Sequence, residues 1–267
     1  MKIRLCYFDV DETLVDSSRR IVPELERALA RCRQAGVRLS LATGRMYESA
    51  LPYARAISAD APLVLCNGGR IHDPDTGAVL HSRTLAIEEA HRVLGLVKRH
   101  HLHVNLYLND RIYIDHENET SRESAEKDGV VQILVGDLSS FLDGEPMKLL
   151  IIGPGHKLEA LRAEYEAQPH QSEVVRSEPT YLEILPQGVS KGSALSEVSR
   201  LTGIPLSEIA AFGDSNNDLE LLQAAGLGIA VANALPNLKA AADRTATQPR
   251  GLGVAEQLEL LVDEVHQ

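Results

Sequence analysis

Two aspartates, Asp9 and Asp11, directly follow the apolar segment 3–8. In an extended chain, residues two apart point to the same side, so these two carboxylates can face the same space. Two carboxylates that close cannot both ionise cheaply without a cation. Adding Asp214 gives an all-oxygen ligand set, which suits Mg²⁺ rather than zinc or copper. The sequence therefore predicts Mg²⁺ as a cofactor, bound by Asp9, Asp11 and Asp214.

Two further groups bring the donors that a phosphoryl group requires. Thr43, in Thr43-Gly44-Arg45, offers a hydroxyl, and Lys191, in Ser190-Lys191-Gly192, offers an ammonium. Chemistry on a phosphoryl group needs a nucleophile, a metal to screen charge and fixed donors to the equatorial oxygens. The sequence can supply all three.

Each of these groups taken alone has an ordinary explanation. An Asp-x-Asp pair is more often a helix cap or a solvated turn, and Thr-Gly-Arg is often only a turn between a strand and a helix. Asp214 to Asp218 could equally be an N-cap followed by acidic residues of a first turn. Their common placement decides between the readings, because each group follows a predicted strand or opens a predicted helix. In a parallel sheet such positions converge at the carboxyl ends of the strands.

The elements that would position these groups alternate between strand and helix. Short apolar runs predict buried strands at 3–8, 37–42, 63–66, 209–212 and 227–231. Pro23 opens a helical pattern that Gly36 closes, with Leu25, Leu29 and Cys32 on one face. This alternation predicts an α/β fold with a doubly wound, Rossmann-like parallel sheet.

The character of the chain changes between 84 and 184. Strand-like segments at 103–108 and 148–152 alternate with helical ones there, and seven of the ten histidines lie in this stretch. We therefore expect a catalytic core domain formed by 1–83 and 185–267, with an inserted α+β cap domain at 84–184 that acts as a lid. His100, His101 and His103 lack matching cysteine or carboxylate spacing, so we interpret them as surface residues rather than a metal site.

Composition limits the partners. Against 27 Lys and Arg stand 38 Asp and Glu, a net charge of −11 that argues against nucleic acid or an anionic membrane as partner. The three cysteines are odd in number and lie in apolar surroundings, which favours a reducing cytoplasm. No run approaches the roughly 18 apolar residues of a membrane span. We expect a cytoplasmic protein, either a monomer or a weak homodimer.

In their order and spacing, the four groups resemble the motifs of the haloacid dehalogenase superfamily of phosphatases. The similarity is to the Cof-type branch, subfamily IIB, which carries a large cap, and it covers essentially the whole chain. The fourth motif matches Gly213-Asp214-Ser215-Asn216-Asn217-Asp218, and Asn67-Gly68-Gly69 resembles the glycine-rich loop of this branch. Glu12 departs from the pattern, since the family usually has Gly or Asp there.

The resemblance implies a role for each matched residue. Asp9 would be the nucleophile that becomes an aspartyl-phosphate. Asp11 would be the general acid and base, and would contact the metal through its backbone carbonyl only. The residues implied to bind the phosphoryl group are Thr43, Gly44, Arg45, Lys191 and Asn217. Thr13 and Asp218 would support their neighbours without contacting metal or substrate.

The function implied is Mg²⁺-dependent hydrolysis of a small phosphorylated metabolite, with a sugar phosphate as the first expectation. Two alternatives remain open. One is a sugar phosphomutase or phosphotransferase that uses the same intermediate, and the other is a catalytically silent ligand-binding module. The core motifs do not separate phosphatase from mutase.

Overall fold

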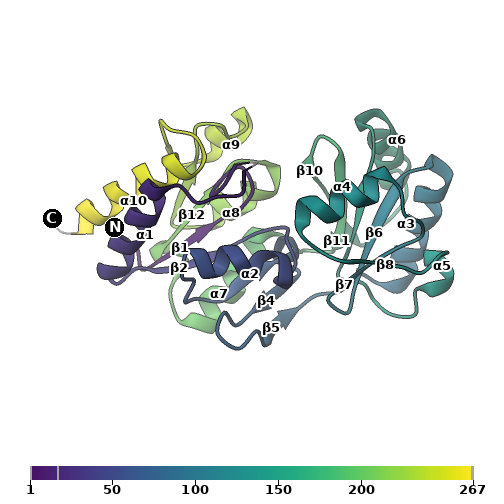
Figure 1. Ribbon diagram of the computed structural model, residues 1–267, viewed down its shortest axis with the longest axis horizontal. Helices are drawn as coiled ribbons and strands as arrows, with labels where there is room; N and C mark the ends of the chain where they lie inside the picture. Colours follow the sequence, from purple (N-terminus) through teal and green to yellow (C-terminus); the bar gives the residue numbers. More distant parts are fainter. Residues whose placement is uncertain (1, 17, 266–267) are drawn as a thin grey trace. The chain divides into compact units, whose positions relative to one another are not determined.

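The computed structural model describes residues 2–16 and 18–265, and it divides into two compact units (Figure 1). The core unit contains the residues up to His81 and those from Ser190 on. The inserted unit contains Ser82–Val189. Each unit has its own apolar core.

The core unit is built on a five-stranded parallel sheet with the strand order β14-β13-β12-β1-β2. The strands are β1 (Leu5–Phe8), β2 (Arg38–Leu41), β12 (Ile209–Gly213), β13 (Leu227–Ala230) and β14 (Arg244–Thr245). β1 lies between β2 and β12 and is buried throughout, which is why its sequence is a continuous apolar run. The predicted fold class, an α/β protein with a parallel sheet, is confirmed.

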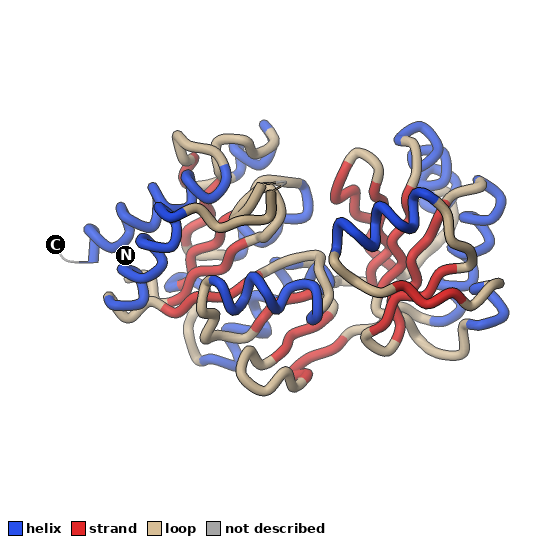
Figure 2. Tube along the Cα trace, in the orientation of Figure 1, coloured by secondary structure: helices blue, strands red, loops and turns tan. Residues whose placement is uncertain are grey.

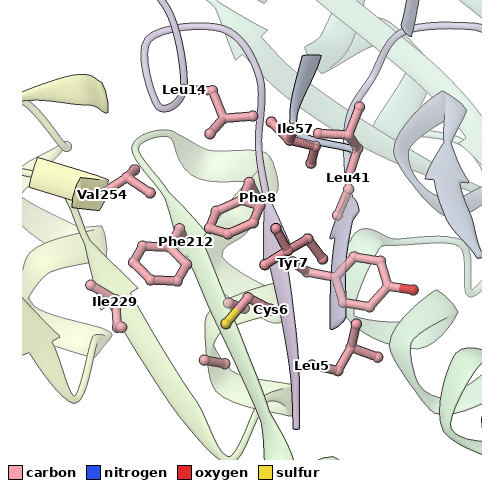
Figure 3. Packing of buried hydrophobic residues seen from close by; sticks show 14 of the residues in the cluster. Leu5, Cys6, Tyr7, Phe8, Leu14, Leu41, Ile57, Phe212, Ile229 and Val254 are labelled. Atoms are coloured by element: carbon pink, nitrogen blue, oxygen red, sulfur yellow. The ribbon is translucent and has the colours of Figure 1, made fainter. Parts of the chain in front are cut away.

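Helices cover both faces of this sheet, as Figure 2 shows. They are α1 (Pro23–Gln34), α2 (Tyr47–Ala56), α7 (Lys191–Thr202), α8 (Leu219–Ala224), α9 (Pro236–Ala241) and α10 (Arg250–Val265). Pro23 starts α1, and Leu25, Leu29 and Cys32 are buried on its inner face, as the periodicity predicts. The rings of Phe8 and Phe212, from neighbouring strands, pack against each other (Figure 3), and their centroids are 5.0 Å apart.

The third predicted strand does not extend the parallel sheet. β3 (Leu63–Leu65) belongs to a separate three-stranded sheet with β4 (Arg70–His72) and β5 (Val79–Ser82). One isolated bridge, Ala42 to Val64, connects it to the chain beyond β2. β3 ends after three residues because Cys66 and Asn67 take positive φ, and the chain then turns back to pair antiparallel with β3. Three short 3₁₀ helices complete the unit: η1 (Cys66–Gly68), η2 (Leu206–Glu208) and η3 (Asn216–Asp218).

The inserted unit is a six-stranded mixed sheet with the order β10-β11-β9-β6-β7-β8. Its strands are β6 (His103–Leu108), β7 (Arg111–Ile114), β8 (Gln132–Leu134), β9 (Lys148–Ile152), β10 (Ser172–Glu178) and β11 (Tyr181–Pro186). Its helices are α3 (Ile87–His100), α4 (Glu119–Asp128), α5 (Leu138–Phe141) and α6 (Gly155–Glu166). β6 and β9 have the bounds that the sequence predicts. Every second residue of β6, beginning at Val104, joins the apolar cluster that α3 and α6 cover.

One expectation for the histidines is wrong. His103 is only 5% exposed, and its Nε2 lies 3.0 Å from Asn105 Oδ1. Both side chains point away from the apolar cluster, and Asn105 Nδ2 donates to Ser124 Oγ of α4 over 3.0 Å. The histidine is buried because α4 covers the polar face of the sheet, a long-range contact that local spacing does not reveal. His101 is exposed, as expected.

Within the described residues, no helix combines the length and apolar character that crossing a membrane requires.

Candidate active site

The site forms where strands of the parallel sheet end. Asp9 follows β1 and its backbone N–H donates to Phe212 O over 3.0 Å, while Asp214 follows the neighbouring strand β12. Asp9, Asp214 and Asp218 each place one carboxylate oxygen within 4.8 Å of the others. Thr13 Oγ1 donates to Asp214 Oδ1 over 2.7 Å. The fold thus brings together acidic side chains from the first and the last part of the chain.

Lys191 lies among these carboxylates and its side chain is fully buried. Its Nζ donates to Asp9 Oδ1 over 2.7 Å and to Asp218 Oδ1 over 2.6 Å. The lysine is the first residue of α7, whose N-cap Ser190 forms a capping box with Ser193. Gly192 allows α7 to approach α8, because a Cβ there would lie 2.4 Å from Glu220 O. The Ser-Lys-Gly sequence therefore starts a helix and places an ammonium in the site.

The electrostatics of the site reflect this crowding. Burial raises the pKa of Asp9 well above its ordinary value, with Lys191 opposing and the neighbouring carboxylates adding to the rise. Burial, followed by the charge of Asp218, raises the pKa of Asp214 to about 7, and the bond from Thr13 opposes that rise. Burial lowers the pKa of Lys191, but Asp218 and Asp9 outweigh it and the net pKa is raised. The lysine is therefore protonated, and its single positive charge does not balance the three carboxylates around it.

These residues fit a divalent cation. If the three clustered carboxylates are ionised and Lys191 is protonated, three negative charges and one positive charge leave two negative charges. Asp218 is the poorest ligand of the three, because Oδ1 accepts from Lys191 and Oδ2 accepts from the backbone N–H groups of Asp214 and Ser215. Asp9 and Asp214 are thus the side chains that would hold Mg²⁺, an ion that prefers oxygen ligands.

The carboxylate of Asp11 is paired with an arginine of the second motif. Arg45 donates to it twice, from Nε to Oδ2 over 2.8 Å and from Nη2 to Oδ1 over 2.7 Å. The guanidinium is nearly buried, packs over the Tyr53 ring and also donates to Ser49 Oγ. A bidentate pair of this kind fixes the orientation of both groups. The predicted metal contact of the Asp11 backbone carbonyl and the predicted phosphate contact of Arg45 stay predictions.

The remaining predicted phosphate ligands lie in two neighbouring loops. Thr43 is buried directly after β2, and its Oγ1 accepts from the Arg45 N–H over 3.2 Å. Asn217 Nδ2 donates to Asn67 Oδ1 over 3.0 Å, and its Oδ1 accepts from Ser215 Oγ. A Cβ on Gly44 would contact the Asn67 side chain at 3.2 Å. Asn67 therefore lies beside two of the predicted ligands.

Glu12 has a partner that the sequence does not indicate. Its Oε2 accepts from Arg250 Nε over 2.8 Å, and Arg250 Nη2 lies 2.7 Å from the same oxygen in an ion pair. Arg250 begins α10, and its backbone N–H donates to Asn233 Oδ1, while the Asn233 amide donates to the Glu12 backbone carbonyl. The two partners are 238 residues apart, so no local pattern could have found the pair.

Comparison with known proteins supports the reading of the motifs. The model of the haloacid dehalogenase-like hydrolase family matches residues 6–258. The chain is 33% identical to an HMP-PP phosphatase of Citrobacter koseri over 238 residues, which covers 88% of this chain and 86% of the relative. It is 26% identical to the pyridoxal phosphate phosphatase YbhA of Escherichia coli over 261 residues, covering 91% and 93% of the two chains.

A solved structure shows the same fold. The crystal structure of a haloacid dehalogenase-like hydrolase from Bacteroides thetaiotaomicron aligns with a TM-score of 0.86 at 28% identity, covering 97% of this chain and all of that one. The chain belongs to the haloacid dehalogenase-like hydrolase family, as its four motifs indicate. Its curated relatives in that family are phosphatases.

Proposed function

We propose that the protein is a Mg²⁺-dependent phosphatase that hydrolyses a small phosphomonoester through an aspartyl-phosphate on Asp9. The observation that carries this proposal is the cluster of Asp9, Asp214 and Asp218 around one buried lysine. Such a cluster combines a carboxylate nucleophile, an oxygen-lined cation site and a fixed ammonium. Those are the parts that phosphoryl transfer requires.

In the first step an oxygen of Asp9 attacks phosphorus, and the bond from phosphorus to the ester oxygen breaks. Lys191 donates to Asp9 Oδ1, the oxygen that would also hold the cation, which leaves Oδ2 to attack. When bound, Mg²⁺ supplies positive charge that screens the carboxylates from the phosphoryl oxygens. Lys191, Thr43, the backbone of Gly44, and Asn217 would bind those oxygens as their charge shifts.

Asp11 would protonate the departing alkoxide and then take a proton from the water that hydrolyses the aspartyl-phosphate. Arg45 fixes the orientation of the Asp11 carboxylate through two hydrogen bonds. We assign the two aspartates different tasks because their partners differ. Asp9 faces an ammonium inside the cluster, and Asp11 is partly exposed and bound by a guanidinium.

A small phosphorylated metabolite is the proposed substrate, with a sugar phosphate as the first choice. The relatives named for pyridoxal phosphate and HMP-PP add phosphorylated heterocycles to the compounds worth testing. We further propose that the inserted unit acts as the lid of the core unit and that the enzyme works in the cytoplasm. The proposed cytoplasmic location is supported by the three buried cysteines, which are thiols and not disulfides.

The test is phosphate release from sugar phosphates, pyridoxal phosphate, flavin mononucleotide and p-nitrophenyl phosphate, with Mg²⁺ or with EDTA. We expect Mg²⁺-dependent release by the wild type and a loss of about 10⁴-fold or more in Asp9→Asn, because the nucleophile is removed. Asp11→Asn should be slower than wild type by about 10²- to 10⁴-fold and should accumulate phosphoenzyme.

Release that persists in pure Asp9→Asn would overturn the nucleophile assignment. If none of the compounds releases phosphate but a bisphosphate activator yields an isomerised sugar phosphate, the protein is a mutase with the same intermediate. If Mg²⁺ neither stabilises the protein nor supports turnover, the silent binding module is the better description.

A further inference from the structure

The turn at Cys66–Gly68 connects loops that carry three of the predicted motifs. Its backbone is fixed to the second motif, because the Cys66 N–H donates to Arg45 O and the Asn67 N–H donates to Thr43 O, each over 3.0 Å. Both residues have positive φ, which is uncommon outside glycine. The turn is therefore held in an uncommon backbone conformation directly against the Thr-Gly-Arg loop.

The same turn packs against the start of α7. Gly68 has a φ of +100°, and a Cβ on it would lie 2.1 Å from Ser190 O and 3.2 Å from Ala194 Cβ. No other residue could approach the α7 N-terminus this closely without moving it. The turn thus supports the element that begins with Lys191.

The side chain of Asn67 extends this support to the fourth motif. Its Oδ1 accepts from Asn217 Nδ2 over 3.0 Å, and Asn217 is 150 residues away in the sequence. Asn67 itself is only 1% exposed. Its Nδ2 is buried and has no hydrogen-bond partner among the described residues. Gly44 gives this amide its space, since a Cβ on Gly44 would lie 3.2 to 3.3 Å from the amide oxygen and nitrogen.

We propose that Asn67 is a positioning residue for phosphoryl binding, which it controls by orienting Asn217. The inference rests on the proposed function, because Asn217 is a phosphoryl ligand only if the protein binds phosphoryl groups. A side chain kept for stability alone would not fit this position. A buried amide nitrogen without a partner destabilises the fold, and glycine would satisfy the positive φ at no such cost. Side chains retained against stability are typical of functional sites.

The test uses Asn67→Gly, which removes the side chain and keeps a residue suited to the φ of 54°. Asn109→Gly is the matched control, since Asn109 has a φ of 52° and lies exposed in the turn between β6 and β7 of the other unit. We expect Asn67→Gly to weaken the binding of inorganic phosphate in Mg²⁺ by about 10- to 100-fold, the range for a bond to a charged group. KM for p-nitrophenyl phosphate should rise similarly, and Tm should change little. The control should change neither the affinity for phosphate nor the KM.

A double-mutant cycle with Asn217→Ala separates positioning from an independent contribution. If Asn67 acts through Asn217, the double variant should bind phosphate no more weakly than Asn217→Ala alone. Losses that multiply would overturn the proposal, as would an Asn67→Gly variant that binds phosphate like the wild type. If the wild type itself neither binds phosphate nor hydrolyses any phosphomonoester, the proposed function fails and this inference fails with it. Wild-type measurements therefore distinguish the two failures.

Discussion

Each unit of the protein buries one lysine among acidic groups, and the two surroundings differ. In the inserted unit, Lys148 Nζ lies 2.6 Å from Glu183 Oε2 and 4.7 Å from the centre of the Tyr107 ring. In the core unit, Lys191 contacts Asp9 and Asp218, with Asp214 beside them. Both lysine side chains are nearly inaccessible, with 3% and 0% exposed. The two lysines are therefore equally buried, but Lys148 is paired with one carboxylate and Lys191 lies among three.

The difference supports the proposed roles, in which Lys148 serves the fold and Lys191 serves the reaction. A buried ion pair is tolerable when each charge has a partner, as Lys148 and Glu183 have. Three carboxylates around one ammonium are not balanced. Burial is the main cause of the raised pKa values of Asp9 and Asp214, and the neighbouring carboxylates add to the rise. An unbalanced cluster persists in a stable protein where a ligand completes it. We infer that the missing positive charge is supplied by Mg²⁺.

Replacing the two lysines by methionine should give the largest contrast. Under the proposed function, Lys191→Met removes an ammonium that donates to the reacting phosphoryl group, so we expect kcat to fall by about 10²- to 10³-fold. Lys148→Met leaves Glu183 buried and unpaired, which should cost about 3–5 kcal/mol of stability. Its kcat per folded molecule should change far less than that of Lys191→Met. Urea unfolding and phosphate release measure the two effects.

A second substitution checks the reason for the stability loss. Lys148→Met combined with Glu183→Leu removes both charges and should recover most of the lost stability, because an apolar pair of similar volume replaces the ion pair. If Lys148→Met abolishes turnover as fully as Lys191→Met does, the distinction between a structural and a reactive lysine is wrong.

Losing one carboxylate charge from the acidic cluster should raise the stability of the protein, whereas losing the metal should lower it. Mg²⁺ at 100 times its Kd should stabilise the wild type by about 2.7 kcal/mol relative to EDTA. Asp214→Asn removes one of the uncompensated charges, so we expect this variant to be more stable than the wild type in EDTA and to lose the Mg²⁺ effect. Urea unfolding in both buffers measures this. An equal Mg²⁺ effect in Asp214→Asn would place the ion elsewhere.

Local pattern predicted much of the fold, since the spacing of apolar residues is enough to give the bounds of β6 and β9. The motifs likewise predicted that Asp9, Lys191 and Asp214 would converge, because parallel strands end at one edge. Contacts across the chain were not predictable in this way. Arg45 binding to Asp11 and Asn67 binding to Asn217 depend on side-chain directions at loops that carry no periodic signal. The short β3 is a similar case, since two positive φ angles end it.

A smaller effect should appear at His103, the buried histidine of the inserted unit. Burial lowers its pKa below the ordinary 6.5, and the bond to Asn105 only partly opposes this. Above pH 6.5 both folded and unfolded states are neutral there, so its contribution to stability is complete. Below pH 6.5 the unfolded state takes up the proton first, and stability should fall by up to about 1.4 kcal/mol per pH unit.

Hydrogen exchange of the β6 amides between pH 5 and 7 measures this slope locally. His103→Gln should abolish it, and the exposed His101→Gln should leave it unchanged. A slope that survives His103→Gln would mean that another group in the inserted unit is out of balance, and the contrast between the two units would be weaker.

The smallest effect concerns whether Glu12 adds to the uncompensated charge. It lies near enough to raise the pKa of Asp214, yet Arg250 binds its carboxylate. Both side chains are more than 40% exposed, so the pair should contribute about 1 kcal/mol or less. Glu12 also has a φ of 59°, which suits glycine. We therefore expect Glu12→Gly to leave stability nearly unchanged.

The affinity for Mg²⁺, measured by calorimetry, shows whether Glu12 adds to the uncompensated charge. If Arg250 neutralises Glu12, then Glu12→Gly should change the Kd for Mg²⁺ by less than about threefold, because a balanced pair has little field at the metal site. Arg250→Gly should tighten Mg²⁺ binding, since it frees a carboxylate beside Asp214 and its own φ of 50° also suits glycine. The double variant should return to the wild-type affinity. A tenfold weakening in Glu12→Gly alone would instead count Glu12 among the charges that Mg²⁺ balances.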